Sequence, residues 1–310
     1  MNTIVINNNL LGDGLMCMPA VRDWHAQGNP VTMIVSDREF NNIYQHSPAI
    51  DELVVATDAQ LSSLKSKYRD AIGKVAVFGD KAIFIPDICK ALVMSQQNVT
   101  WEDDNGRKRR RHPSYVKMIG RQMGLTITDT HYPIRLLDDE IKYGQDFVAS
   151  FSKPLLVCAA LSTSCTSRES SRAVQLPPNK MLSATVWNEF IDYYKDRFDF
   201  LFVGAKGEKT IPVNADWMLG EDIRKVAAIC KACAAVVSID TGIMHLAQAV
   251  DANLLAICAA VSSQLTDCSA TKGKYYCVDH SEFSPLYSPI TAVTSAELID
   301  GLKNVVEGLE

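Results

Sequence analysis

Long hydrophobic runs are missing from this sequence: no apolar stretch approaches the roughly 18 residues that a helix needs to cross a bilayer. The N-terminus has neither the basic region nor the small-residue cleavage site of a signal peptide. A disulfide pattern is missing too, because the nine cysteines are odd in number and scattered along the chain. We therefore expect a cytoplasmic protein with reduced thiols.

A metal-ligand cluster is also absent. Cys230-x-x-Cys233 has no second Cys or His pair at ligand spacing, and it falls inside a helical pattern. Buried small residues explain this pair better than a metal or redox site. The net charge of −5 does not favour a polyanionic partner for the protein as a whole. A basic run from Arg107 to Arg111 nevertheless stands out.

What the sequence does contain is a repeated alternation of short apolar strands and helices. In the first half the pattern predicts strands at 3–7, 31–36, 53–56, 74–78 and 83–86, and helices at 14–26, near 40 and at 114–124. In the second half it predicts strands at 155–161, 200–204, 236–239, 254–258 and 275–278, and helices at 184–197, 223–233 and 295–309. Short apolar strands between helices favour parallel sheets covered on both faces.

The length of the chain favours two domains. At 310 residues it has the size at which a single core commonly splits. The strand-and-helix alternation restarts after residue 150, so we expect an α/β protein with two Rossmann-like halves, 1–150 and 151–310, joined by a linker at 142–154.

The most informative stretch is 234–245, where a buried strand runs into Asp240-Thr241-Gly242 and a helix follows. Asp240 is expected to cap that helix, because its carboxylate can accept from the N–H groups of the first turn. Thr241 and His245 are spaced to share one polar face of the helix. Free N–H groups, the helix dipole, a glycine and a hydroxyl together make a cradle for a phosphate or diphosphate. An ordinary strand-to-helix junction is the alternative.

Two motifs carry a family resemblance. Asp-Thr-Gly-x-x-His at 240–245, followed by Leu-Ala-x-Ala, resembles the donor-binding motif of glycosyltransferase family 9, the ADP-heptose:lipopolysaccharide heptosyltransferases. Residues 12–22 are similar to the family's Gly-Asp-x-Leu-x-x-x-Pro-Ala-x-Arg signature. The resemblance covers nearly the whole chain. It implies the GT-B fold, in which an acceptor-binding domain (1–150) and a nucleotide-sugar-binding domain (151–310) face each other across a cleft.

Asp13 is the candidate catalytic residue. Sugar transfer needs a base that takes the proton of the acceptor hydroxyl. Asp13 lies on the turn between the first strand and its helix, where from the residues alone a helix N-cap is an equally good role. The family resemblance implies that Asp13 is the catalytic base. One base and one displacement imply inversion at the anomeric carbon, as in the family.

The leaving diphosphate must be neutralised without an obvious metal site. The sequence contains no Asp-x-Asp pair, which favours a metal-independent and cofactor-free reaction. The N–H groups of Thr241 and Gly242 are the expected donors, together with a side-chain cation. The loop after the strand at 155–161 is rich in hydroxyls and offers that cation; the predicted residues are Ser162, Thr163 and Arg172. A solvated loop arginine is the alternative for Arg172.

One departure from the family concerns the donor pocket. After the strand at 254–258 the family usually has Phe-Gly-Pro-Thr, whereas this chain reads Cys-Ala-Ala-Val-Ser-Ser at 258–263. This substitution changes the expected wall of the pocket. The ADP-linked heptose donor is therefore the family's default and not a property of these residues. A nucleotide-sugar epimerase and a catalytically silent nucleotide-sugar-binding protein are rival hypotheses.

The acceptor is expected to be anionic. Lys65, Lys67, Arg69 and the run that begins at Arg107 resemble the basic loops with which heptosyltransferases hold the carboxylates and phosphates of the lipopolysaccharide inner core. The resemblance thus implies an anionic glycan or glycolipid acceptor, and it is compatible with peripheral contact at the inner membrane face. Nucleic acid is the other polyanion, disfavoured because no aromatic residues interleave with the run. A solvated loop is the alternative.

Overall fold

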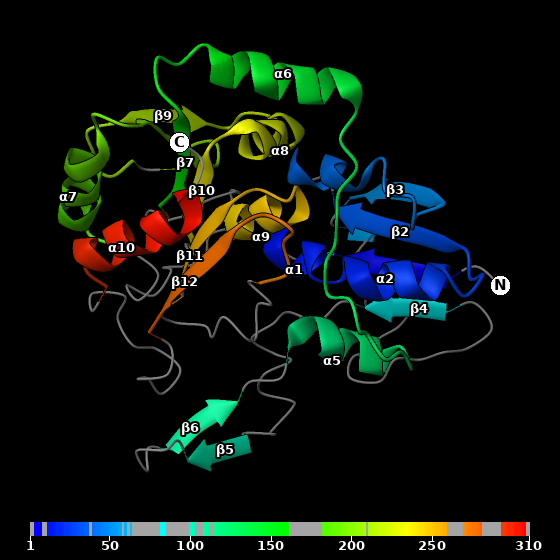
Figure 1. The fold of residues 1–310 in the computed structure, drawn as a ribbon. Helices are drawn as coiled ribbons and strands as arrows, with labels where there is room; N and C mark the ends of the chain where they lie inside the picture. Colours follow the sequence, from blue (N-terminus) through cyan, green and yellow to red (C-terminus); the bar gives the residue numbers. More distant parts are fainter. Residues whose placement is uncertain are drawn as a thin grey trace. The chain divides into compact units, whose positions relative to one another are not determined.

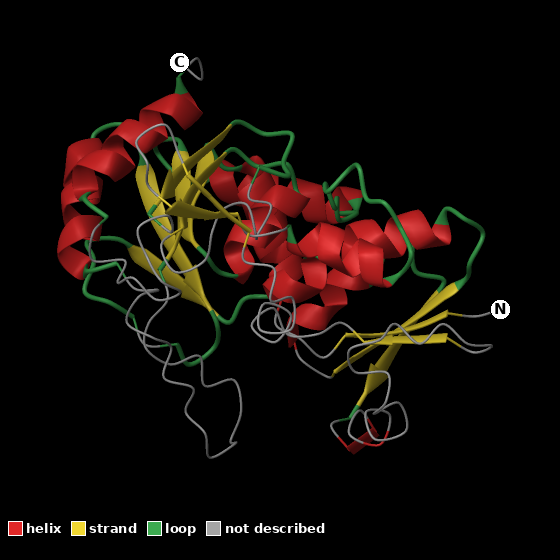
Figure 2. Cartoon of the chain, turned by 90° about the horizontal axis from the view of Figure 1, so that it is seen from below, coloured by secondary structure: helices red, strands yellow, loops and turns green. Residues whose placement is uncertain are grey.

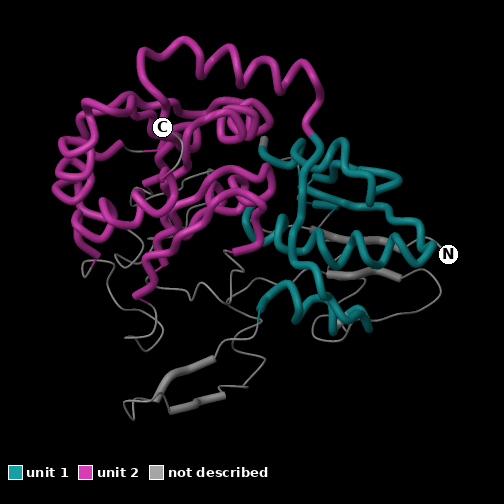
Figure 3. Tube along the Cα trace, in the orientation of Figure 1, with its two compact units in different colours: residues 1–135, 264–267 teal, residues 136–263, 268–310 magenta. Residues whose placement is uncertain are grey.

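The protein forms two compact units, of which the first comprises residues 1–135 and the second begins at Leu136 (Figure 3). The structure, a computed structural model, describes residues 3–7, 11–36, 39–57, 59–60, 63, 81–84, 99–102, 108–111, 114–160, 182–208, 210–258, 269–280 and 293–307. Each unit contains its own parallel sheet flanked by helices (Figure 1). The α/β class predicted from the sequence is confirmed.

The sheet of the first unit has four parallel strands in the order β3-β2-β1-β4. Their bounds are β1 Thr3–Asn7, β2 Val31–Ser36, β3 Glu52–Ala56 and β4 Lys81–Phe84. The chain builds outward from β1 through β2 to β3 and then adds β4 on the other side of β1. The order therefore reverses beside β1, and such a switch point is where open α/β sheets bind ligands.

The helix predicted at 14–26 is in fact two short helices, α1 (Leu11–Leu15) and α2 (Met18–His25). Pro19 lies in the first turn of α2, where a missing N–H costs no helical hydrogen bond. Proline is common in the first turn of a helix, so a new helix can begin here. The spacing of apolar residues did not reveal the break between α1 and α2. The 3₁₀ helix η1 (Glu39–Tyr44) follows β2.

Helix α5 (Tyr115–Gln122) packs against α2 and lies within the predicted helix at 114–124. The hydroxyl of Ser114 accepts from the N–H of Lys117 and caps the start. Gly124, with φ of +73°, lies just past the end, where a side chain would be strained. A separate antiparallel pair, β5 (Val99–Glu102) and β6 (Lys108–Arg111), precedes α5. The strand candidate at 74–78 lies outside the described residues.

The sheet of the second unit has six parallel strands in the order β12-β11-β10-β7-β8-β9. Their bounds are β7 Leu155–Ala159, β8 Asp199–Gly204, β9 Asp216–Leu219, β10 Ala235–Ile239, β11 Leu254–Cys258 and β12 Tyr275–Asp279. The chain builds from β7 out to β9 and then returns to place β10 on the other side of β7. The switch point of this sheet thus lies between β7 and β10. The short strand β9 was not predicted.

Helices cover both faces of the second sheet (Figures 1 and 2). Helices α7 (Ala184–Tyr194) and α10 (Ser295–Val306) pack on one face, and α8 (Ile223–Ala232) and α9 (Gly242–Ala249) on the other. On the α7 side the ring centroids of Trp187 and Phe202 are 5.1 Å apart, and both side chains are fully buried. Burial of such aromatic area stabilises this half of the core.

The linker predicted at 142–154 is wrong, because helix α6 (Asp138–Ala149) occupies most of it. α6 packs along α8, and a Cβ on Gly144 would lie 2.3 Å from the carbonyl oxygen of Ala228. Glu140 accepts from the guanidinium of Arg224 at 2.5 and 2.7 Å. This packing assigns α6 to the second compact unit. The predicted boundary at residue 150, between an acceptor-binding and a nucleotide-sugar-binding domain, stays a prediction.

Candidate active site

The turn after β10 lies at the switch point of the second sheet. Ser238 of β10 is in register with Ala159 of β7, so both strands end at the same level. The carboxyl end of β7 therefore lies beside the Asp240-Thr241-Gly242 turn. The predicted donor residues Ser162, Thr163 and Arg172 follow β7 in the sequence and lie outside the described residues. Adjacent strand ends at a switch point form the position where α/β sheets bind nucleotides.

Thr241, not Asp240, caps α9. The Thr241 hydroxyl oxygen accepts from the N–H of Ile243 at 3.2 Å, and its carbonyl oxygen accepts from the N–H of Met244 at 3.1 Å. The predicted Asp240 cap is wrong because the helix begins at Gly242, one residue too late for the Asp240 carboxylate. Within the described ranges, the main-chain N–H groups of Thr241 and Gly242 have no acceptor. Two such donors at the positive end of a helix suit an anion.

Two other predicted donor residues meet at this turn. His245, one turn along α9, is only 2% exposed. Its Nε2 atom lies 4.0 Å from Oδ1 of Asp240, whose side chain is 12% exposed. The helical spacing read from the sequence thus brings His245 back over the turn. The structure therefore places Asp240, Thr241, Gly242 and His245 in one cluster at the carboxyl edge of the sheet.

Glu208 is a residue at this edge that sequence reasoning missed. It follows β8, the strand next to β7, and is 9% exposed. Its Oε2 atom accepts from the N–H of Ala205 at 2.9 Å, and the turn between them contains Gly207 with φ of +75°. The signal in the sequence was a glycine-containing turn straight after a buried strand. A buried carboxylate beside a switch point is suited to accepting hydrogen bonds from ligand hydroxyls.

Asp13 lies at the equivalent edge of the first sheet. It occupies the first turn of α1, after β1, and is half-buried. The alternative interpretation as a helix N-cap is wrong, because Asp13 is inside α1. Its carbonyl oxygen accepts from the thiol of Cys17 at 3.0 Å. Burial, and after it the charge of Asp13, raise the pKa of the Cys17 thiol well above its usual value. The thiol therefore stays protonated beside the carboxylate.

Arg22, the last residue of the N-terminal motif, binds the main chain instead of the Asp13 edge. Its guanidinium donates to the carbonyl oxygen of His131 at 2.6 Å and to that of Asp129 at 2.8 Å. It also forms an ion pair with the carboxylate of Asp129 at 3.3 Å. The arginine thus fixes the extended segment that leads from α5 to α6 onto α2.

The predicted acceptor residues Lys65, Lys67, Arg69 and Arg107 lie outside the described residues. The rest of the basic run, Lys108–Arg111, forms β6. Part of the run that was interpreted as a loop is therefore a strand. In its register Arg109 pairs with Trp101 of β5, so an aromatic residue stands opposite the basic run, although none interleaves with it in the sequence.

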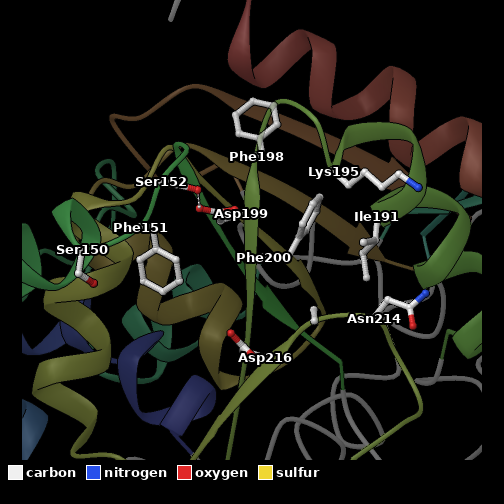
Figure 4. Close-up of a pocket in the computed structure, with 11 residues that line it drawn as sticks. Ser150, Phe151, Ser152, Ile191, Lys195, Phe198, Asp199, Phe200, Asn214 and Asp216 are labelled. Atoms are coloured by element: carbon white, nitrogen blue, oxygen red, sulfur yellow. Dashed lines mark hydrogen bonds between the residues drawn. The ribbon is translucent and has the colours of Figure 1, made fainter.

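A separate hollow of about 670 Å³ opens at the other edge of the second sheet (Figure 4). It is lined by the turn before β7, the end of α7 and the starts of β8 and β9, with Phe151, Lys195, Phe200 and Asp216 among its residues. Asp199 there accepts from the hydroxyl of Ser152 at 3.2 Å. Because these are the amino ends of parallel strands, the hollow is distinct from the edge that bears Asp240.

Within the described ranges, no cluster of His, Cys, Asp or Glu side chains could hold a metal ion. Cys230 and Cys233 are free and buried, as the sequence predicted for small core residues. Burial raises the pKa of the Cys233 thiol to about 12 and that of Cys230 well above its usual value. Such thiols are poor nucleophiles at neutral pH. Across the same ranges, no helix has the length and apolar character required to traverse a bilayer.

Comparisons with known proteins agree with this geometry. The profile of glycosyltransferase family 9 (heptosyltransferase) matches residues 219–286, which include the 240–245 motif. Among solved structures, a family 9 glycosyltransferase from Veillonella parvula DSM 2008 is 15% identical, with 98% of this chain and 97% of that chain covered and a TM-score of 0.67. E. coli ADP-heptose lps heptosyltransferase II is 14% identical over 99% and 98%, with a TM-score of 0.66.

E. coli heptosyltransferase WaaC with ADP is 13% identical to this chain, covers 98% of it and 99% of its own length, and has a TM-score of 0.56. No curated protein matches in sequence at a significant level. The family 9 profile thus matches the segment that bears the predicted donor motif, where the protein is similar to glycosyltransferases of that family. The structural likeness confirms the predicted GT-B fold.

Proposed function

We propose that this protein is a glycosyltransferase that inverts the anomeric carbon of a nucleotide-diphosphate sugar and transfers the sugar to an anionic saccharide without a metal ion. The observation that carries the proposal is the turn after β10. It combines two main-chain N–H groups, which have no acceptor within the described ranges, with the positive end of α9 at a switch point. These donors would bind the diphosphate and stabilise the charge that develops as it leaves.

The donor is proposed to be ADP-linked. ADP is bound in the WaaC structure, whose fold this chain shares, and heptose is the default sugar of the family. Asp240 and His245 lie close enough to act together on the sugar or on the turn itself. Ser162, Thr163 and Arg172 belong to the segment that leaves the neighbouring strand β7, and Arg172 would supply the cation. Glu208 would accept from donor hydroxyls at the next strand end.

Asp13 is proposed as the catalytic base. It lies at the carboxyl edge of β1, at the switch point of the first sheet, which is the position expected for a residue that acts on a bound acceptor. An ionised carboxylate there would take the proton of the attacking hydroxyl, and the oxygen would then displace the diphosphate from the opposite side. Inversion follows from this single displacement.

For the acceptor we propose an anionic glycan or glycolipid such as the lipopolysaccharide inner core, reached from the cytoplasmic side with peripheral membrane contact. The support is the basic character of Lys65, Lys67, Arg69 and Arg107 in the first unit. Neutralising these residues should raise the apparent KM for such an acceptor and leave donor affinity unchanged. Exposed charges are screened over about 8 Å at physiological ionic strength, so the effect should shrink with added salt. Retarded RNA or DNA in a mobility assay would indicate nucleic acid instead.

The test of the function is a panel of ADP-, UDP- and GDP-linked sugars incubated with the purified chain, with and without a lipopolysaccharide core acceptor. Release of ADP that depends on the acceptor, with an inverted product anomer in the NMR spectrum, is the expected result. Isomerisation of the sugar without an acceptor would indicate an epimerase. Binding of a nucleotide sugar with neither transfer nor hydrolysis would indicate a non-catalytic binding protein, and either result would overturn the proposal.

A further inference from the structure

Ser238 carries a buried hydroxyl two residues before Asp240 and is the next-to-last residue of strand β10. Its side chain is fully buried in the layer between the sheet and the helices α8 and α9. Its Oγ atom donates to the carbonyl oxygen of Ile239 at 2.8 Å and lies 3.3 Å from Oγ1 of Thr241. Alanine would suit these apolar surroundings, since burying a hydroxyl is unfavourable unless it forms hydrogen bonds. The bonds that Ser238 makes therefore point to a role in the turn.

The hydroxyl protons of Ser238 and Thr241 have several acceptors within reach. A serine hydroxyl has one proton, and that of Ser238 is donated to the Ile239 carbonyl oxygen. With that proton on the Ile239 carbonyl oxygen, Thr241 is the donor in the contact between the two hydroxyls, whose heavy-atom positions by themselves fit either direction. Because Thr241 Oγ1 also accepts from the N–H of Ile243, its donor and one of its two acceptor positions are used within the protein. A diphosphate offers only acceptors, so this hydroxyl has no proton left to donate to it.

We propose that Ser238 is a positioning residue of the donor site. It holds the Thr241 hydroxyl in the capping orientation, so that the turn presents the main-chain N–H groups of Thr241 and Gly242 to the diphosphate. This inference rests on the proposed function of the turn. Main-chain donors held in place before the ligand arrives need no reorganisation on binding, which is why such a bond improves affinity and the stabilisation of developing charge.

Loss of the Ser238 hydroxyl should weaken ADP binding without affecting folding. Ser238→Ala should raise the Kd for ADP, measured by calorimetry, by about three- to tenfold, the effect of one lost hydrogen bond. The melting temperature should stay close to that of the wild type, because the alanine methyl fits the apolar layer. Ser36→Ala is the matched control: Ser36 is also fully buried at the end of a central strand, in the first unit, and this variant should bind ADP like the wild type.

A double-mutant cycle tests whether Ser238 acts through Thr241. Thr241→Val should weaken ADP binding, whereas Thr241→Ser, which keeps the hydroxyl, should not. In the Ser238→Ala background, Thr241→Val should weaken ADP binding less than it does in the wild type, because the Ser238–Thr241 contact is already lost and only the cap to the Ile243 N–H remains to be removed. Wild-type Kd in Ser238→Ala, or fully additive effects, would overturn the inference while leaving the proposed function intact. Failure of the wild-type protein to bind ADP, UDP or GDP would overturn both.

Discussion

The guanidinium of Arg22 donates to the main-chain carbonyl oxygen of His131 at 2.6 Å. Arg22 ends the N-terminal motif that carries Asp13, and His131 belongs to the extended segment between α5 and α6. One motif therefore has two roles: Asp13 lies at the carboxyl edge of the sheet, whereas Arg22 fixes the segment that leads to the second unit. Because a planar guanidinium can donate hydrogen bonds to two carbonyl oxygens at once, arginine is well suited to this position.

Removing this arginine should destabilise the first unit without removing the catalytic base. We expect Arg22→Ala to lower the free energy of unfolding by about 1–3 kcal/mol, because its hydrogen bonds involve a charged donor. Arg22→Lys should recover only part of the loss, since an ammonium lacks the fork that reaches both carbonyl oxygens. Urea unfolding measures the free energy of unfolding of both variants. Arg121→Ala, an exposed arginine on α5, is the control and should change little.

Asp13→Asn tests the base. The amide keeps the size of the side chain and cannot accept the proton, so turnover should fall by roughly 10²–10⁴-fold with donor affinity nearly unchanged. Glu52→Gln, an exposed acid of β3, is the charge-matched control. Transfer at the wild-type rate by Asp13→Asn would show that another group takes the proton.

Chelation tests the metal-independent reaction. We expect EDTA to leave activity intact, because main-chain donors and a side-chain cation meet the diphosphate. The control is the same preparation after addition of Mg²⁺ or Mn²⁺, which should not change the rate. Activity that EDTA abolishes and either ion restores would mean that carboxylates in this chain hold a catalytic metal.

The buried ion pair of Arg224 with Glu140 should dominate the docking of α6 on α8. Their side chains are 5% and 17% exposed. Arg224→Ala leaves the Glu140 carboxylate without its partner and should cost about 3–5 kcal/mol in urea unfolding. Lys142 and Asp146 of α6 form an exposed pair at 2.8 Å, and Lys142→Ala should cost at most about 0.5 kcal/mol. Equal effects of the two substitutions would contradict this interpretation.

The stability of the second unit should fall in acid through Glu297. Burial by itself raises the pKa of Glu297, but hydrogen bonds from Thr294 and His280 outweigh it and lower that pKa below the usual value. A lowered folded-state pKa contributes stability that is present above the usual pKa and is lost as the pH falls through the folded-state value.

Glu297→Gln can still complete the capping box with Thr294 but cannot titrate. Its free energy of unfolding should therefore vary less than that of the wild type between about pH 5 and pH 3. Asp300→Asn, an exposed acid on the same helix, serves as control and should keep the wild-type slope. Parallel pH profiles for the wild type and Glu297→Gln would assign the acid sensitivity to other carboxylates.

Local sequence patterns predicted most of the described strands, most of the helices and the location of the Asp240-Thr241-Gly242 turn, but not β5, β6 or β9. The runs 235–239 and 254–258 are apolar enough to be buried at every position, and both are central strands. Ser114 and Gly124 marked the two ends of α5. These features depend on neighbours within a few residues, so a single sequence reveals them. The 240–245 motif was recognisable for the same reason.

Tertiary structure decided the features that depend on distant partners. The sequence does not show that α6 packs on α8 through Glu140 and Arg224, and so the segment was interpreted as a linker. It also does not show that β10 returns to the side of β7, which creates the switch point beside the donor turn. The choice of Thr241 over Asp240 as the cap followed from where β10 ends against its neighbours. Apolar periodicity records which residues are buried, whereas the partner that buries them is set by contacts between segments far apart in the chain.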